Sequence, residues 1–261
     1  MRPPGTLLAV HVLLLAASLK CFGQDSASCA SLYGEGITAQ GGIGYCAVRD
    51  DHMSTERYAG ASSSAAFQWS RVHDTYAFRL GMQYQNAPAI KNHNVSAEVT
   101  SGDVFFSDIY PLSPWSVFGT EVNIGLGPSA DMFAYYRRQH IALNPGTTPD
   151  VYESGAYLFS LGVRLEASVP LGDLFRAGAA LQTGLLSLGG GSGSTPNNAS
   201  GVELLTPFAG LHAASEIVIS YTPFTLFSLA AGYRFEIVRV DSWNYLVAAG
   251  DNAFLSLTCH L

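Results

Sequence analysis

Apolar and polar residues alternate along most of this chain. In residues 75–86, TYAFRLGMQYQN, every second residue is apolar and Arg79 falls on the polar parity. Similar runs occur at 117–127, 161–169 and 227–237. Because successive side chains of a β-strand point to opposite faces, each run predicts a strand with one apolar face and one polar face. The runs match the ~9–11 residues that a tilted strand needs to cross a membrane.

Short and long connectors alternate between these runs. The short ones are 72–74, 111–114, 171–173 and 222–224, and the longer polar ones are 49–56, 87–94, 139–153, 189–202 and 239–245. They separate ten segments, at 35–48, 57–71, 75–86, 95–110, 116–138, 154–170, 174–188, 203–221, 225–238 and 246–260. Alternation of tight turns and long loops is typical of membrane barrels. The pattern therefore predicts an all-β fold, a closed antiparallel up-and-down transmembrane β-barrel of about ten strands (8–12 being compatible) over residues 35–261.

Composition agrees with membrane strands. Charged residues make up 13% of the chain, against about 25% in soluble domains. After the N-terminus there is no apolar run of the ~18 residues that a membrane helix needs. A secreted β-sandwich fits composition alone, and the long alternating runs count against it. The net charge is −7 and no basic block occurs, so we expect no binding of nucleic acid.

The N-terminus is typical of a secretory signal peptide. Arg2 precedes an apolar stretch at 6–19, and Cys21 and Gly23 are small residues before a cleavage position. This pattern predicts a signal peptide at 1–23, followed by a short periplasmic segment at 24–34.

Three cysteines would follow that cleavage, Cys29, Cys46 and Cys259. An odd count gives no complete disulfide framework, and the spacing matches no metal motif. A Cys29–Cys259 pair near one end of the barrel is one arrangement, and separate thiols are the other, which we favour. We expect no cofactor and no metal.

The last strand carries a resemblance to a known class of protein. Residues 252–261 read NAFLSLTCHL, with Leu255, Leu257, Cys259 and Leu261 on one parity. This strand resembles the C-terminal strand of bacterial outer-membrane β-barrel proteins, although it ends on leucine instead of an aromatic residue. The resemblance covers about 31–261. It implies a place in the cell outer membrane with both termini periplasmic, contact with outer-membrane lipid, and insertion by the barrel-assembly machinery.

Charged residues oppose the apolar stripe in many of the predicted strands. Facing lipid, each arginine would cost about 2–4 kcal/mol, so we predict that the charges point into the lumen and pair there. The predicted set is Arg79, Glu98, Glu121, Asp131, Arg137, Arg164, Glu166, Arg176, Glu216, Arg234 and Glu236. Such a set either plugs the barrel as a structural ion-pair network or lines a narrow pore or ligand cavity. We favour the plug.

No catalytic motif stands out in the sequence, and nucleophile elbows, phosphate loops and zinc-type histidine pairs are missing. Omptin-type proteases, which resemble this chain in strand number, use acidic pairs and a His–Asp pair at the extracellular rim. That resemblance makes Asp50, Asp51, His52 and His140 weak catalytic candidates. As ordinary loop residues they need no such role, and no motif links the chain to omptins or to the ten-stranded neisserial adhesins. His212 is interpreted as a hydrogen-bonded lumen histidine.

The sequence therefore favours a structural or surface-presenting barrel, and it leaves open whether the protein has enzymatic activity. Its extracellular ligand would be bound through the loops at 49–56, 87–94, 139–153 and 189–202. The alternatives are a narrow porin-like channel and an omptin-like or lipid-modifying enzyme.

Overall fold

The computed structural model describes residues 34–50, 54–92, 95–112, 114–117, 119–141, 150–193, 201–202, 206–207, 210–241 and 245–261. The ten long strands of this part are β1 (Gly36–Asp50), β2 (Ser54–Val72), β3 (Ala77–Asn92), β4 (Val95–Pro111), β6 (Thr120–Ile141), β7 (Asp150–Pro170), β8 (Phe175–Gly193), β11 (Gly210–Phe224), β12 (Phe227–Asp241) and β13 (Tyr245–Cys259). Short strands β5 (Trp115–Val117), β9 (Gly201–Val202) and β10 (Thr206–Pro207) pair with β6, β8 and β8. Among the described residues, no helix is long and apolar enough to cross a membrane.

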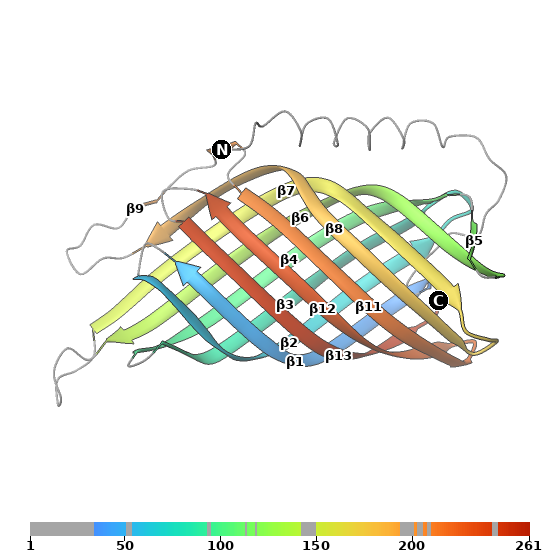
Figure 1. Ribbon diagram of the computed structural model, residues 1–261, viewed down its shortest axis with the longest axis horizontal. Helices are drawn as coiled ribbons and strands as arrows, with labels where there is room; N and C mark the ends of the chain where they lie inside the picture. The colour runs from blue at the N-terminus through green and yellow to red at the C-terminus, as the bar shows by residue number, and fades with distance from the viewer. Residues whose placement is uncertain are drawn as a thin grey trace.

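The long strands form a closed barrel (Figure 1). Each pairs antiparallel with its neighbours in chain order, and β1 pairs with β13 to close the sheet. The predicted all-β, up-and-down barrel of about ten strands is therefore confirmed. The predicted signal peptide at 1–23 and most of the segment at 24–34 lie outside the described residues.

The two ends of the barrel differ. The short connections lie at one end, here called the turn end, where Ile37 at the start of β1 faces Cys259 at the end of β13. The turn end is on the right of Figure 1, close to the C-terminus. The longer connections lie at the opposite end, here called the loop end.

Three connectors differ from their predicted form. The predicted loop at 87–94 is mostly strand, because β3 continues to Asn92 through a bulge that keeps Ile90 buried. The predicted turn at 222–224 belongs to β11, and the chain turns instead at Thr225–Leu226. After Pro111 the chain forms a small β5–β6 hairpin before it re-enters the barrel.

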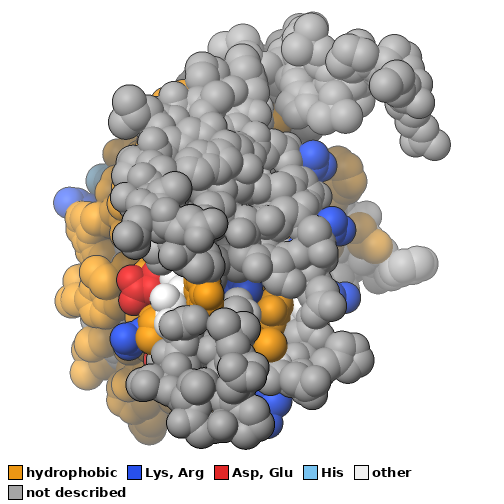
Figure 2. All heavy atoms as spheres, turned by 90° about the vertical axis from the view of Figure 1, so that its left-hand side faces the viewer, with side chains coloured by type: hydrophobic (Ala, Val, Ile, Leu, Met, Phe, Trp, Pro, Cys, Tyr) orange, Lys and Arg blue, Asp and Glu red, His pale blue; other side chains and the backbone are white. Residues whose placement is uncertain are grey.

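The barrel is inverted relative to a soluble protein. Outward apolar side chains are strongly exposed, as in Met82 (58%), Ile217 (63%) and Leu255 (71%), whereas Arg79 on the inner face is 0% exposed. In Figure 2, which faces the loop end, hydrophobic side chains cover the outer wall on the left. An apolar outer surface around a polar interior is the arrangement of a barrel surrounded by lipid.

The interior has three zones along its length. Buried hydroxyl side chains occupy the zone near the turn end, among them Thr38, Ser70, Ser107, Ser168, Ser228, Ser256 and Thr258. Charged side chains fill the middle. An apolar cluster occupies the zone near the loop end, formed by Cys46, Val48, Tyr58, Ala87, Ile90, Ala97, Val99, Phe133, Tyr135, Ala156, Leu158, Val238, Val240 and Leu246.

Two inward glycines make room for aromatic rings in this narrow interior. A Cβ atom at Gly81 would lie 2.4 Å from the ring of Phe105, and one at Gly232 would lie 2.4 Å from the ring of Phe254. Both separations are too short for carbon atoms, so each ring occupies the space that a side chain would need. Glycine thus lets a large ring lie flat against the neighbouring strand.

The lipid-facing surface gives a first prediction. Ile217→Arg should lower the free energy of unfolding by about 2–4 kcal/mol, because the charge would enter the apolar belt near the middle of β11. Ser96→Arg, on the exposed start of β4 at the loop end, should cost at most about 1 kcal/mol. Urea titration of both variants in lipid vesicles measures the difference. Equal effects of the two substitutions would contradict this placement of the belt.

Candidate functional site in the barrel interior

A salt bridge between Arg79 and Glu166 crosses the interior. Arg79 Nη2 donates to Glu166 Oε2 at 2.6 Å, and Arg79 Nη1 contacts Glu166 Oε1. Both side chains are about 1% exposed. Arg79 lies on β3 and Glu166 on β7, so the pair spans two intervening strands. Two parallel contacts of this kind fix the guanidinium in one plane.

Glu166 is shared with a second arginine on its own strand. Arg164 Nε donates to Glu166 Oε1 at 2.7 Å, and Arg164 Nη1 donates to Gln182 Oε1 at 3.2 Å. Arg164 Nη2 also lies 4.0 Å from a carboxylate oxygen of Glu216. Residues two apart on a strand share a face, so β7 places both partners of this pair inside the barrel.

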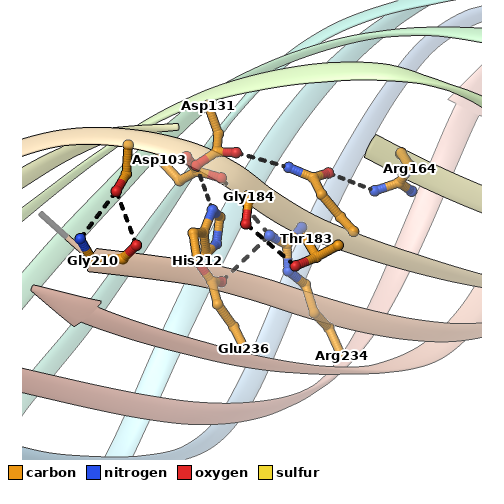
Figure 3. Close-up of polar contacts among 11 residues, drawn as sticks. Asp103, Asp131, Arg164, Thr183, Gly184, Gly210, His212, Arg234 and Glu236 are labelled. Carbon is orange, nitrogen blue, oxygen red and sulfur yellow. Dashed lines mark hydrogen bonds and ion pairs between the residues drawn. The ribbon is translucent and has the colours of Figure 1, made fainter. Parts of the chain in front are cut away.

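The centre of the network is a histidine between two carboxylates. His212 Nδ1 contacts Asp131 Oδ1, and His212 Nε2 lies 2.8 Å from Glu236 Oε1 (Figure 3). Gln182 Nε2 donates to the other oxygen of Asp131 at 3.2 Å. His212 is fully buried. Both ring nitrogens therefore face acceptors, and each carries either a proton or another cation.

Arg234 extends the network to the opposite wall. Its Nη2 donates to Glu236 Oε2 at 3.3 Å and lies 3.8 Å from Asp103 Oδ2. Asp103 is on β4 and Arg234 on β12, and four strands separate them in either direction around the barrel. The contacts therefore reach from one wall to the one directly across the lumen.

Arg137 belongs to a separate group nearer the loop end. Its guanidinium carbon lies 4.3 Å from the ring centroid of Tyr58, and its Nη2 contacts Gln139 Oε1. Gln139 Nε2 in turn lies 3.3 Å from Tyr58 Oη. All three side chains are buried. The ring face of Tyr58 and the amide of Gln139 thus take the place of water around the buried guanidinium of Arg137.

The structure brings most of the predicted lumen residues inside the barrel. Eight of the eleven are within the interior of the described barrel, namely Arg79, Asp131, Arg137, Arg164, Glu166, Glu216, Arg234 and Glu236. Seven of them form the central network, and Arg137 forms the separate group.

Three of the predictions are wrong. Glu98 is exposed on the outer face of β4, because the inward positions beside it are Ala97 and Val99. Glu121 and Arg176 have the inward parity but lie exposed at the turn end, where β6 and β8 begin. Their strands extend beyond the packed interior, so parity alone does not bury them.

Two members of the network were missed. Asp103 lies in a stretch of β4 where Val104, Phe105 and Phe106 follow in a row, which hides the alternation. Gln182 is neutral and carries no charge signal, although it shares the parity of buried Ala180 on β8. Ser101, Asp103 and Ser107 are separated by even numbers of residues, so they share one face of β4. This parity would have indicated that Asp103 points into the lumen.

The weak catalytic candidates are not brought together in the described part of the chain. Asp50 is the last residue of β1, and His140 is on β6, with β2, β3 and β4 between these strands. Asp51 and His52 lie outside the described residues. Cys46 is buried and Cys259 is exposed, and both are free thiols. Cys29 lies outside the described residues.

A small cavity adjoins the network on the loop side. Its volume is about 30 Å³, and its lining includes Asp103, Glu236, Gln83 and Tyr135. A cavity of at least ~10–15 Å³ holds one water molecule. The space therefore suits water or a small ion and not an organic ligand.

Comparisons with known proteins show the fold. No protein-family profile and no curated protein sequence matches the chain. Among solved structures, the outer membrane protease OmpT from Escherichia coli is 7% identical, with coverage of 89% of this chain and 99% of that one and a TM-score of 0.53. The translocator domain of the autotransporter NalP from Neisseria meningitidis is 12% identical, with 98% of each chain covered and a TM-score of 0.46. The chain thus has the fold of an outer-membrane β-barrel, and these low identities transfer no activity.

The Arg79–Glu166 pair gives a second prediction. Arg79→Leu should lower the free energy of unfolding by about 3–5 kcal/mol, because it leaves Glu166 buried with one cation fewer. Arg138→Leu is the matched control: its ion pair with Glu153 is 3.6 Å long and both side chains are nearly half exposed, so the change should be below about 1 kcal/mol. Denaturant unfolding in detergent measures both. A loss for Arg79→Leu as small as the control's would show that the pair does not stabilise the barrel.

Proposed function

We propose that the protein is an outer-membrane barrel whose lumen is closed and whose long connections are held at the cell surface to bind an extracellular ligand. In this proposal the turn end and both termini face the periplasm. The mature barrel contacts outer-membrane lipid and is inserted by the barrel-assembly machinery. The binding connections are those near 49–56, 139–153 and 189–202, together with the β3–β4 connection.

The observation that carries the closed lumen is the network that reaches across it. Arg79 meets Glu166, and Arg234 approaches Asp103 on the opposite wall. The apolar cluster then fills the interior toward the loop end. A conducting pore needs a continuous wet path, and these two layers leave little room for one. They support a structural role for the interior over a narrow porin-like channel.

Strand length supports surface presentation. The strand β6 has 22 residues and β7 has 21. At ~3.3 Å per residue and a tilt of ~45°, 22 residues rise about 50 Å, roughly twice the apolar band of ~25 Å. Several outward residues near the loop end are charged and exposed, among them Arg57, Glu98 and Arg138. The barrel wall thus continues beyond the lipid and would hold its connections away from the membrane.

Conductance tests the closed lumen. The purified, folded protein should give no stable single-channel steps in planar lipid bilayers in which a porin conducts. The double variant Asp103→Ser, Arg234→Ser removes two side chains that approach each other across the lumen. If opening the network creates a pore, this variant should give single-channel steps under conditions in which the unchanged protein gives none. Stable steps from the unchanged protein would contradict the closed lumen.

Epitope tags test the orientation. A short tag inserted within 194–200 should bind antibody on intact cells, because the proposal places this connection outside. A tag between Thr225 and Leu226, at the turn end, should bind only after the outer membrane is permeabilised. Heat-modifiable mobility of each tagged protein in detergent gels checks that it folds. The reverse labelling pattern would overturn the orientation.

A further inference from the structure

We propose that Asp103, Asp131 and His212 form a binding site for one divalent transition-metal ion at the centre of the barrel interior. Each residue offers one ligand atom, and the three atoms lie within 4.8 Å of one another. All three side chains are buried. Asp103 and Asp131 come from the neighbouring strands β4 and β6, and His212 comes from β11, so an ion at this point would join two separate parts of the wall (Figure 3).

The donor set selects the class of ion. Two carboxylates and one imidazole suit Zn²⁺ or Mn²⁺, whereas Ca²⁺ and Mg²⁺ take oxygen ligands. Ligand atoms at bond lengths of ~2.0–2.2 Å from one ion lie about 3–4 Å apart. The three present atoms lie within 4.8 Å of one another, so the two carboxylates would rotate for one ion to bind all three.

A second layer of contacts already orients these ligands. His212 Nε2 lies 2.8 Å from Glu236 Oε1, so the proton on this nitrogen can be donated to the carboxylate. That leaves the lone pair of Nδ1 directed at Asp131, whose other oxygen accepts from Gln182 Nε2. A carboxylate behind the imidazole is the usual support of a metal-binding histidine. The ion would take the place of the proton between Nδ1 and Asp131.

Asp103 is the independent sign that a cation belongs here. Its side chain is 4% exposed, and neither of its oxygens has a hydrogen-bond partner among the described residues. Arg234 Nη2 lies 3.8 Å from Asp103 Oδ2, which is too far for a hydrogen bond. A buried carboxylate without hydrogen bonds is strongly disfavoured. A metal ion bound by Asp103 would satisfy it directly.

The net charge of the network also favours binding of a cation. Five carboxylates lie in it, those of Asp103, Asp131, Glu166, Glu216 and Glu236, against three arginines and His212. With all five carboxylates ionised and His212 protonated, the sum is one negative charge in a poorly hydrated space. A divalent ion that displaces one proton from His212 brings the sum to neutral. The adjoining cavity gives room for a water molecule as a further ligand.

Metal titration of the folded, tag-free barrel tests the proposal. After treatment with EDTA, calorimetry with Zn²⁺ and with Mn²⁺ should show one site per chain for at least one of these ions, and Co²⁺ should give visible absorption bands typical of bound Co²⁺. Asp103→Asn and His212→Gln should each abolish this binding. Glu236→Gln should weaken it about 10- to 100-fold, because it alters the support of the histidine.

Glu153→Gln is the control. The Glu153 carboxylate is nearly half exposed and pairs with Arg138, so it belongs neither to the three ligands nor to the central network, and affinity should change less than threefold. Heat-modifiable gel mobility shows that every variant is folded. Absence of binding by the folded, unchanged protein, or equal binding by His212→Gln, would overturn the proposal. Conductance is measured separately, so this site and the closed lumen can fail independently.

Discussion

The rest of this structure depends on the balance of charge inside a narrow barrel with an apolar outer surface. Charged side chains cannot point toward lipid, so those on the membrane-spanning part of a strand must find their partners inside the lumen. Arg79 and Glu166 illustrate the result, because they lie on β3 and β7 and are almost fully buried. The ten strands are joined around the barrel by backbone hydrogen bonds and through it by these side chains.

The same network gives the middle of the barrel a specific chemistry. Arg79, Arg164 and Arg234 lie between the walls, and their planar donors contact several carboxylates. His212 and Asp131 meet in the one part of the network where carboxylates outnumber arginines. The proposed closure of the lumen and the proposed metal site therefore rest on the same network. On the loop side of the network, the apolar cluster packs inside the barrel.

In strands with regular alternation of apolar and polar residues, the sequence predicted which side chains point into the lumen. Leu80 and Arg79 on β3 fall on the predicted faces, as do Leu255 and Leu257 on β13. Parity could not tell how far along the barrel a residue lies, which is why Glu121 was placed in the lumen although it is exposed at the turn end. It also failed where apolar residues run consecutively, as they do after Asp103.

The sequence by itself determined the class of fold, the number of long strands and the face of most residues, because the period of two is set by the backbone and the outer surface must be apolar. Only the tertiary structure decided which charges meet. Asp131 is 81 residues from His212, and their contact depends on strand stagger and barrel closure. Register across β6, β7, β8 and β11 fixes the height of each side chain in the lumen. The position of a side chain along the lumen cannot be predicted from the residues next to it in the sequence.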